Sequence, residues 1–113
     1  MSDFEQLEIE KKWQNVLQFV GEKFGQVEDI KDVVFLIGIQ ELGFGFRKFT
    51  KDEKIDVIHV GVCSLLSQYG YYEFIGRDKD GWPHWELTTP LPEMSEKDNE
   101  ALMKQSIIDF FNQ

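Results

Sequence analysis

The chain has 113 residues, one cysteine and a net charge of −9. This length predicts a single domain, residues 1–113, that can bury a core without disulfide bonds. A lone cysteine excludes an intramolecular disulfide and suits a reducing compartment, and an acidic surface repels phosphate backbones and acidic lipids.

The first ten residues, MSDFEQLEIE, are acidic and amphipathic, unlike a signal peptide. The longest apolar run, residues 33–39, falls short of the ~20 residues that span a bilayer. We therefore expect a cytoplasmic protein that does not contact membranes. No cofactor is predicted, because the sequence lacks a phosphate loop, a dinucleotide fingerprint, zinc-finger spacing, an EF-hand loop and a nucleophile elbow.

The N-terminal half predicts two helices. The first begins after Ser2, whose hydroxyl can cap the amide of Glu5, and it ends near residue 25. The second covers about residues 29–42 and is apolar on nearly all sides, with Gly38 at its middle. A helix of this kind is expected to be buried by several neighbours.

A third helix is predicted over residues 51–69. Thr50 and Glu53 have the spacing of a capping box. Helical periodicity gives it the following apolar stripe: Ile55, Ile58, Val62, Leu65, Leu66 and Tyr69. Gly61 lies mid-helix, so we predict that the second and third helices form a close antiparallel pair that meets at Gly38 and Gly61.

Two aromatic strands, residues 71–76 and 82–87, follow the third helix. The Asp78–Gly81 segment between them suits a type I turn with Gly81 in the left-handed conformation. The predicted register pairs Arg77 with Trp82, Phe74 with Trp85, Glu73 with Glu86, and Tyr72 with Leu87. A last helix, capped by Ser95, completes an α+β domain of four helices with one antiparallel β-hairpin between the third and the fourth.

His59 and Cys63 are four residues apart on the third helix and share a face with Asp56. The simplest interpretation is that Cys63 is a small core residue. The alternatives are a weak metal site at His59 and Cys63, or a thiolate activated by imidazole.

Candidate binding residues lie in two places. On the outer hairpin face they are Tyr71, Arg77, Trp82 and His84, and Arg77 is predicted to stack on Trp82 as a cation–π pair. Before the third helix they are Phe46, Arg47 and Lys48. Tryptophan and tyrosine are enriched at interface hot spots. Basic residues beside aromatic ones can hold an anion or a single-stranded nucleic acid.

One segment, LLSQYGYYEFIGRDKDGWPHWELT, resembles the end of a recognition helix and the two-stranded wing of a winged-helix domain. The resemblance implies a nucleic-acid-binding regulator. Two features oppose that function: residues 51–69 are predicted to be one continuous helix, and the acidic charge has the wrong sign for DNA.

These patterns favour a non-enzymatic interaction domain that binds a protein partner or itself, with a homodimer formed through the terminal helices or the hairpin face. A winged-helix-like regulator is the first alternative. The second is a ligand-binding or metal-binding protein, or an enzyme, that uses His59 and Cys63.

Overall fold

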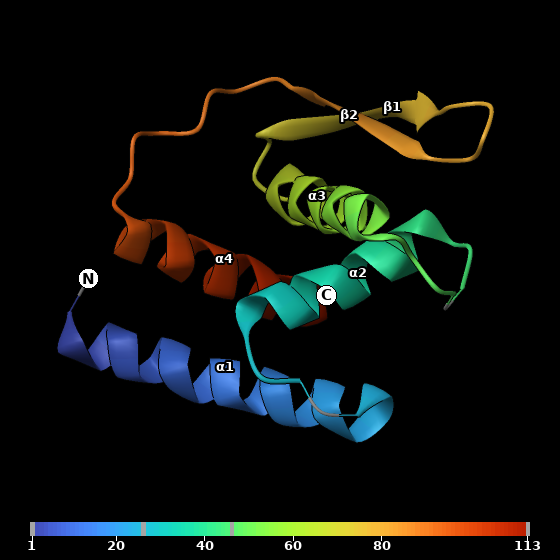
Figure 1. The fold of residues 1–113 in the computed structure, drawn as a ribbon. Helices are drawn as coiled ribbons and strands as arrows, with labels where there is room; N and C mark the ends of the chain where they lie inside the picture. The colour runs from blue at the N-terminus through green and yellow to red at the C-terminus, as the bar shows by residue number, and fades with distance from the viewer. Residues whose placement is uncertain (1, 26, 46, 113) are drawn as a thin grey trace. The chain divides into compact units, whose positions relative to one another are not determined.

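The computed structural model describes residues 2–25, 27–45 and 47–112. Within these residues the order of elements is α1 (Asp3–Phe24), α2 (Ile30–Leu42), α3 (Lys51–Ser67), β1 (Tyr72–Arg77), β2 (Pro83–Leu87) and α4 (Glu96–Phe111) (Figure 1). This order confirms the predicted α+β class, with four helices and one antiparallel hairpin between α3 and α4. None of the described helices is both long and apolar enough to cross a membrane.

Contacts divide the chain into two compact units. One joins the N-terminal segment, up to residue 33, to the C-terminal segment, from residue 94; the other is residues 34–93. Each unit is described by itself. The single domain expected from the length stays a prediction.

Capping bonds confirm three of the predicted helix starts. The side-chain oxygens of Ser2, Thr50 and Ser95 accept bonds of 3.1 Å from the amides of Glu5, Glu53 and Asp98, respectively. A Glu53 carboxylate oxygen accepts from the Thr50 amide at 2.9 Å, which completes the capping box of α3. This helix ends at Ser67 rather than at Tyr69, because the next amides bond carbonyls only three residues back.

In the first unit, α1 and α4 contact each other in the same chain direction. About halfway along α4, Lys104 Nζ lies 3.3 Å from a carboxylate oxygen of Glu10 in the first half of α1, and nearer the ends of both helices the rings of Phe19 and Phe111 lie 6.0 Å apart. Trp13 is buried on α1. The C-terminal helix α4 is therefore packed against α1 rather than free.

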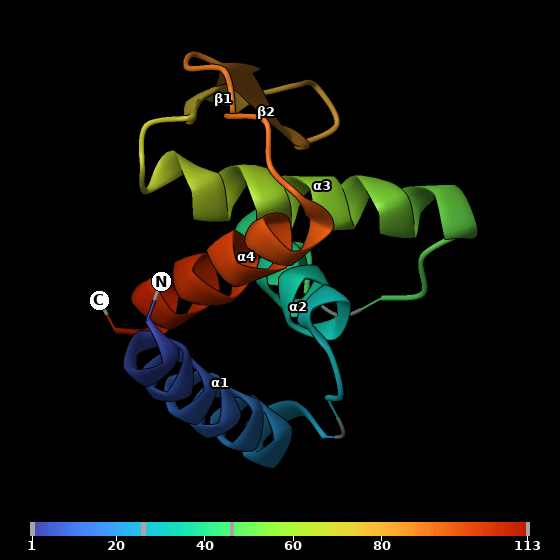
Figure 2. The ribbon, with the colours of Figure 1, turned by 90° about the vertical axis from the view of Figure 1, so that its left-hand side faces the viewer.

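In the second unit, α3 lies between the hairpin and α2 (Figures 1 and 2). The buried residues of α3 are Val57, Val60, Gly61, Cys63, Ser64, Leu65 and Leu66. The predicted stripe is therefore right at Leu65 and Leu66 but wrong at its two ends, Ile55 and Tyr69, which are 59% and 40% exposed. Periodicity alone does not determine which side is buried when a helix is apolar on nearly all sides.

The two mid-helix glycines lie where α2 and α3 touch. A Cβ built on Gly38 would lie 2.9 Å from Val57 Cγ1 and closer still to the Val57 carbonyl oxygen. A Cβ built on Gly61 would meet Val34 in the same way, 2.9 Å from its Cγ1. The predicted close contact is confirmed, and its order is antiparallel. The helices cross at this point, however, rather than lying alongside each other (Figures 1 and 2).

The hairpin register is predicted correctly in the half that is farther from the turn. The observed pairs there are Tyr72 with Leu87, Glu73 with Glu86, and Phe74 with Trp85. A bulge at Ile75 then shifts the register, so that Arg77 pairs with Pro83 and not with Trp82 as predicted. A bulge inserts one unpaired residue into a strand, and no period-two pattern shows where it falls.

Candidate functional site

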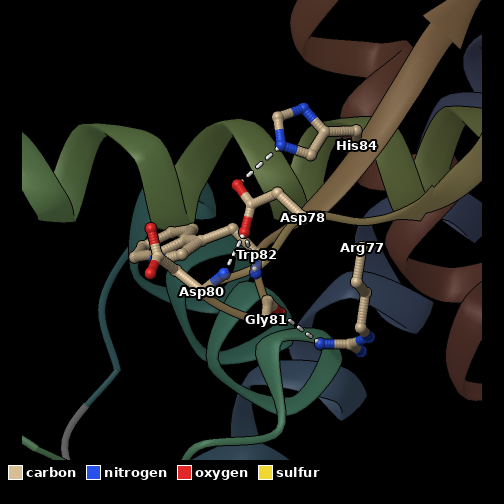
Figure 3. A network of polar contacts seen from close by, with 6 residues as sticks. All are labelled: Arg77, Asp78, Asp80, Gly81, Trp82 and His84. Atoms are coloured by element: carbon tan, nitrogen blue, oxygen red, sulfur yellow. Dashed lines mark hydrogen bonds and ion pairs between the residues drawn. The ribbon is translucent and has the colours of Figure 1, made fainter.

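Asp78 organises the turn of the hairpin (Figure 3). Its Oδ1 accepts from the amides of Asp80 and Trp82 at 2.9 and 3.1 Å, and its Oδ2 lies 2.9 Å from His84 Nε2. The hydrogen bond from His84, followed by the Trp82 amide, lowers the pKa of the Asp78 carboxyl. Gly81 has the predicted positive φ, 87°. A charged carboxylate therefore holds the turn and the His84 ring together.

Arg77 ties the hairpin to the end of α2. Its Nη1 donates to the carbonyls of Leu42 at 2.9 Å and Gly81 at 2.8 Å, and its Nη2 donates to the Glu41 carbonyl at 2.7 Å. The carbonyls in the last turn of a helix have no partner within the helix and carry partial negative charge. Arg77 thus caps α2. The predicted cation–π stack of Arg77 on Trp82 is not among the cation–π contacts of the described residues.

Trp82 packs inward rather than lying on an outer face. It contacts a buried cluster formed by Ile39, Leu42, Phe49 and Val57. The Phe44 ring meets it edge-on, with centroids 6.1 Å apart and an interplanar angle of 90°. The Trp82 side chain therefore mainly contributes to packing within this unit, and only its remaining exposed surface can contact a ligand.

Tyr71 lies at the opposite end of the hairpin from the turn. Its carbonyl accepts from the Thr88 amide at 2.9 Å, just beyond the first strand pair. The structure brings Arg77, Trp82 and His84 together at the turn but leaves Tyr71 outside that group. The single surface predicted from these four residues is therefore divided between the two ends of the hairpin.

The basic loop before α3 is engaged within its own unit. Arg47 Nη2 lies 3.0 Å from a Glu53 carboxylate oxygen, and the Arg47 guanidinium carbon lies 4.8 Å from the centre of the Phe49 ring. Lys48 is exposed. Phe46, the third predicted binding residue here, lies outside the described residues.

His59 and Cys63 are in contact, as their spacing predicts, with 3.5 Å between Nε2 and Sγ. Cys63 is fully buried, and burial raises the pKa of its thiol to about 11. The thiol is therefore protonated at neutral pH. No group of three His, Cys, Asp or Glu residues that could hold a metal ion is found in the described part of the chain.

We predict that Cys63 does not react with a thiol reagent in the folded protein. Reaction requires the thiolate and access to it, and this buried thiol offers neither. Labelling with a chromogenic disulfide at neutral pH, with and without guanidinium, measures the effect. The unfolded chain should react fully and serves as its own control, because Cys63 is the one cysteine in the sequence. Rapid labelling of the folded protein would show that the Cys63 thiol is accessible, and it would favour the alternative of a thiolate activated by His59.

A pocket of about 390 Å³ lies between α3 and the turn half of the hairpin. Its lining residues are Asp56, His59, Val60, Asp78, Trp82, Pro83, His84 and Trp85. The Trp85 Nε1–H is buried and has no hydrogen-bond partner among the described residues. The Trp85 ring packs against the Phe74 ring, with 5.3 Å between their centroids. Sequence spacing places Asp56 beside His59, but nothing in it shows that the hairpin folds over these two residues.

Large apolar side chains are exposed on the hairpin. Phe74, Ile75 and Leu87 have 49%, 60% and 51% of their surface exposed, respectively. The Glu73–Glu86 pair lies along the strands between the pairs that contain Leu87 and Phe74, so its two carboxylates are opposed to each other on the other face of the sheet. Like charges across a strand pair destabilise it, so the face that carries Glu73 and Glu86 has unneutralised negative charge, while Phe74 and Leu87 add apolar surface on the other face.

The hairpin follows α3 directly, as a wing follows a recognition helix. However, α3 is one continuous helix from Lys51 to Ser67, without the break of a helix-turn-helix pair inside it. No protein family, curated protein or solved structure matches the chain.

Proposed function

We propose that the chain is a non-enzymatic interaction domain whose hairpin binds an extended segment of a partner protein that carries both basic and apolar residues. The observation that supports this most directly is the exposure of Phe74, Ile75 and Leu87 on one short hairpin. Exposed apolar surface on a soluble domain marks an interaction site when it is clustered.

Charge favours a basic partner. The opposed carboxylates of Glu73 and Glu86 repel each other in the free protein, and a lysine or arginine placed between them would relieve that repulsion. The chain as a whole carries −9 and so attracts cationic partners. A second copy would bring the same acidic face and would be repelled.

The sheet also favours an extended segment. It has two strands, so in the described residues each strand has one edge without a strand partner. An added strand can bind such an edge through backbone hydrogen bonds while its side chains meet the exposed residues. A cytosolic location is part of the proposal, because the single cysteine suits a reducing compartment.

Self-association through α1 is the second candidate, since Phe4 and Leu7 are 71% and 64% exposed. Light scattering distinguishes the two, because the hairpin proposal requires no dimer. A nucleic-acid-binding regulator has less support: Arg47, the arginine of the basic loop, is already paired with Glu53.

Selection from a random displayed-peptide library against the full chain tests the proposal. We expect enriched peptides that alternate apolar and basic residues. Ile75→Lys should weaken their binding by about tenfold or more, since the change removes an apolar contact and adds repulsion. The matched control is Ile55→Lys, because Ile55 on α3 is 59% exposed and Ile75 is 60% exposed. Acidic selected peptides, or equal effects of the two variants, would contradict the proposed surface.

A further inference from the structure

The pocket between α3 and the hairpin turn has a chemistry of its own, independent of the proposed peptide surface. Its α3 wall carries the carboxylate of Asp56 and its hairpin wall that of Asp78. Among the described residues that line it, none is lysine or arginine. These lining residues therefore include no permanent cation; the other titratable groups among them are the imidazoles of His59 and His84, and His84 Nε2 lies 2.9 Å from Asp78 Oδ2.

The apolar part of the lining is aromatic. Trp82 and Trp85 both contribute to it, next to Pro83 and Val60. The face of an indole ring attracts a positive charge more strongly than that of any other side-chain ring. Pockets of roughly 300–1,000 Å³ suit small molecules, and this one measures about 390 Å³.

We infer that this pocket binds a small organic ammonium ion, with its charge near Asp56 and its hydrocarbon against the tryptophans. A metal ion fits less well, because the described residues hold no group of three suitable ligands. An anion would meet two carboxylates. A neutral aromatic molecule could pack on the indoles but would leave Asp56 unpaired, so the decisive comparison is between a cation and its neutral isostere.

The test is a titration of the full-length chain with choline, tetramethylammonium and tyramine, followed by the indole N–H resonances in NMR spectra. The resonances of Trp82 and Trp85 should shift and saturate at millimolar ligand, while that of Trp13, which lies in the other unit, should not move. The neutral isostere of choline, 3,3-dimethylbutan-1-ol, should give no saturable shift.

Asp56→Asn is the diagnostic variant and Asp52→Asn its matched control. Both changes remove one exposed carboxylate from α3, but only Asp56 lines the pocket. Asp56→Asn should weaken ammonium binding by roughly tenfold, as expected for losing one charge a few ångströms away near a protein surface. Asp52→Asn should change it by less than about twofold, since that charge is screened by solvent.

Three results would overturn the inference. They are equal binding of choline and its neutral isostere, equal effects of the two asparagine variants, and no saturable shift with any of the three cations. None of them bears on the peptide proposal, because Ile75, the residue that tests it, does not line this pocket.

Discussion

Alanine at Gly38 or Gly61 is expected to lower the free energy of unfolding by about 2 kcal/mol. Alanine favours a helix over glycine by about 1 kcal/mol, but overpacking a close contact costs about 1–3 kcal/mol or more. Here the added methyl group would meet a backbone carbonyl, of Val57 or of Val34, and not the far end of a flexible side chain. The carbonyl cannot rotate away, so the steric cost should exceed the gain in helix propensity.

Urea denaturation of the two variants, with Gly21→Ala as the control, measures this effect. Gly21 is inside α1, and a Cβ built on it meets nothing within 4 Å. The control should therefore gain about 0.5–1 kcal/mol from helix propensity alone. Gly38→Ala or Gly61→Ala variants as stable as the control would show that α2 and α3 do not approach as closely as described.

Removing the guanidinium of Arg77 is expected to cost about 2 kcal/mol of stability. Arg77→Ala deletes three hydrogen bonds from a charged donor to the carbonyls of Glu41, Leu42 and Gly81. One hydrogen bond to a charged group contributes about 1.5–3 kcal/mol. Arg77 is exposed, so water replaces much of what is lost, and we expect the three bonds together to contribute about as much as one such bond. Arg77→Lys should recover only part of the loss, because an ammonium group lacks the planar fork that reaches several carbonyls at once.

Thermal or urea unfolding checks the Arg77 prediction against Lys79→Ala. Lys79 lies in the same turn, is exposed, and carries the same charge. Its removal should change stability by less than about 0.5 kcal/mol, as is usual for an exposed surface substitution. If Arg77→Ala costs no more than Lys79→Ala, the hairpin is not held to α2 by this side chain.

Features governed by nearby residues could be predicted from the sequence. The caps at Ser2, Thr50 and Ser95, the Gly81 turn and the contact between His59 and Cys63 all join residues at most four positions apart. The close approach of α2 and α3 at Gly38 and at Gly61 could also be predicted, because glycine inside an apolar helix is costly and a close backbone contact gives a reason for it.

Features that depend on tertiary placement could not be predicted in the same way. Arg77 caps a helix that ends 35 residues earlier in the chain, and no local pattern links the two. Because α3 is apolar on nearly all sides, periodicity does not determine which side faces inward, and the predicted stripe includes Ile55, which is exposed. The bulge at Ile75 displaced Arg77 from Trp82 and changed the roles of both residues.

Trp82 serves both the interior of residues 34–93 and the pocket beside α3. Because its ring is already fixed by the cluster around Val57 and by Phe44, it has little freedom left to lose when a small molecule arrives. Loosening that cluster would therefore weaken ligand affinity through entropy, even where no lining residue had been altered.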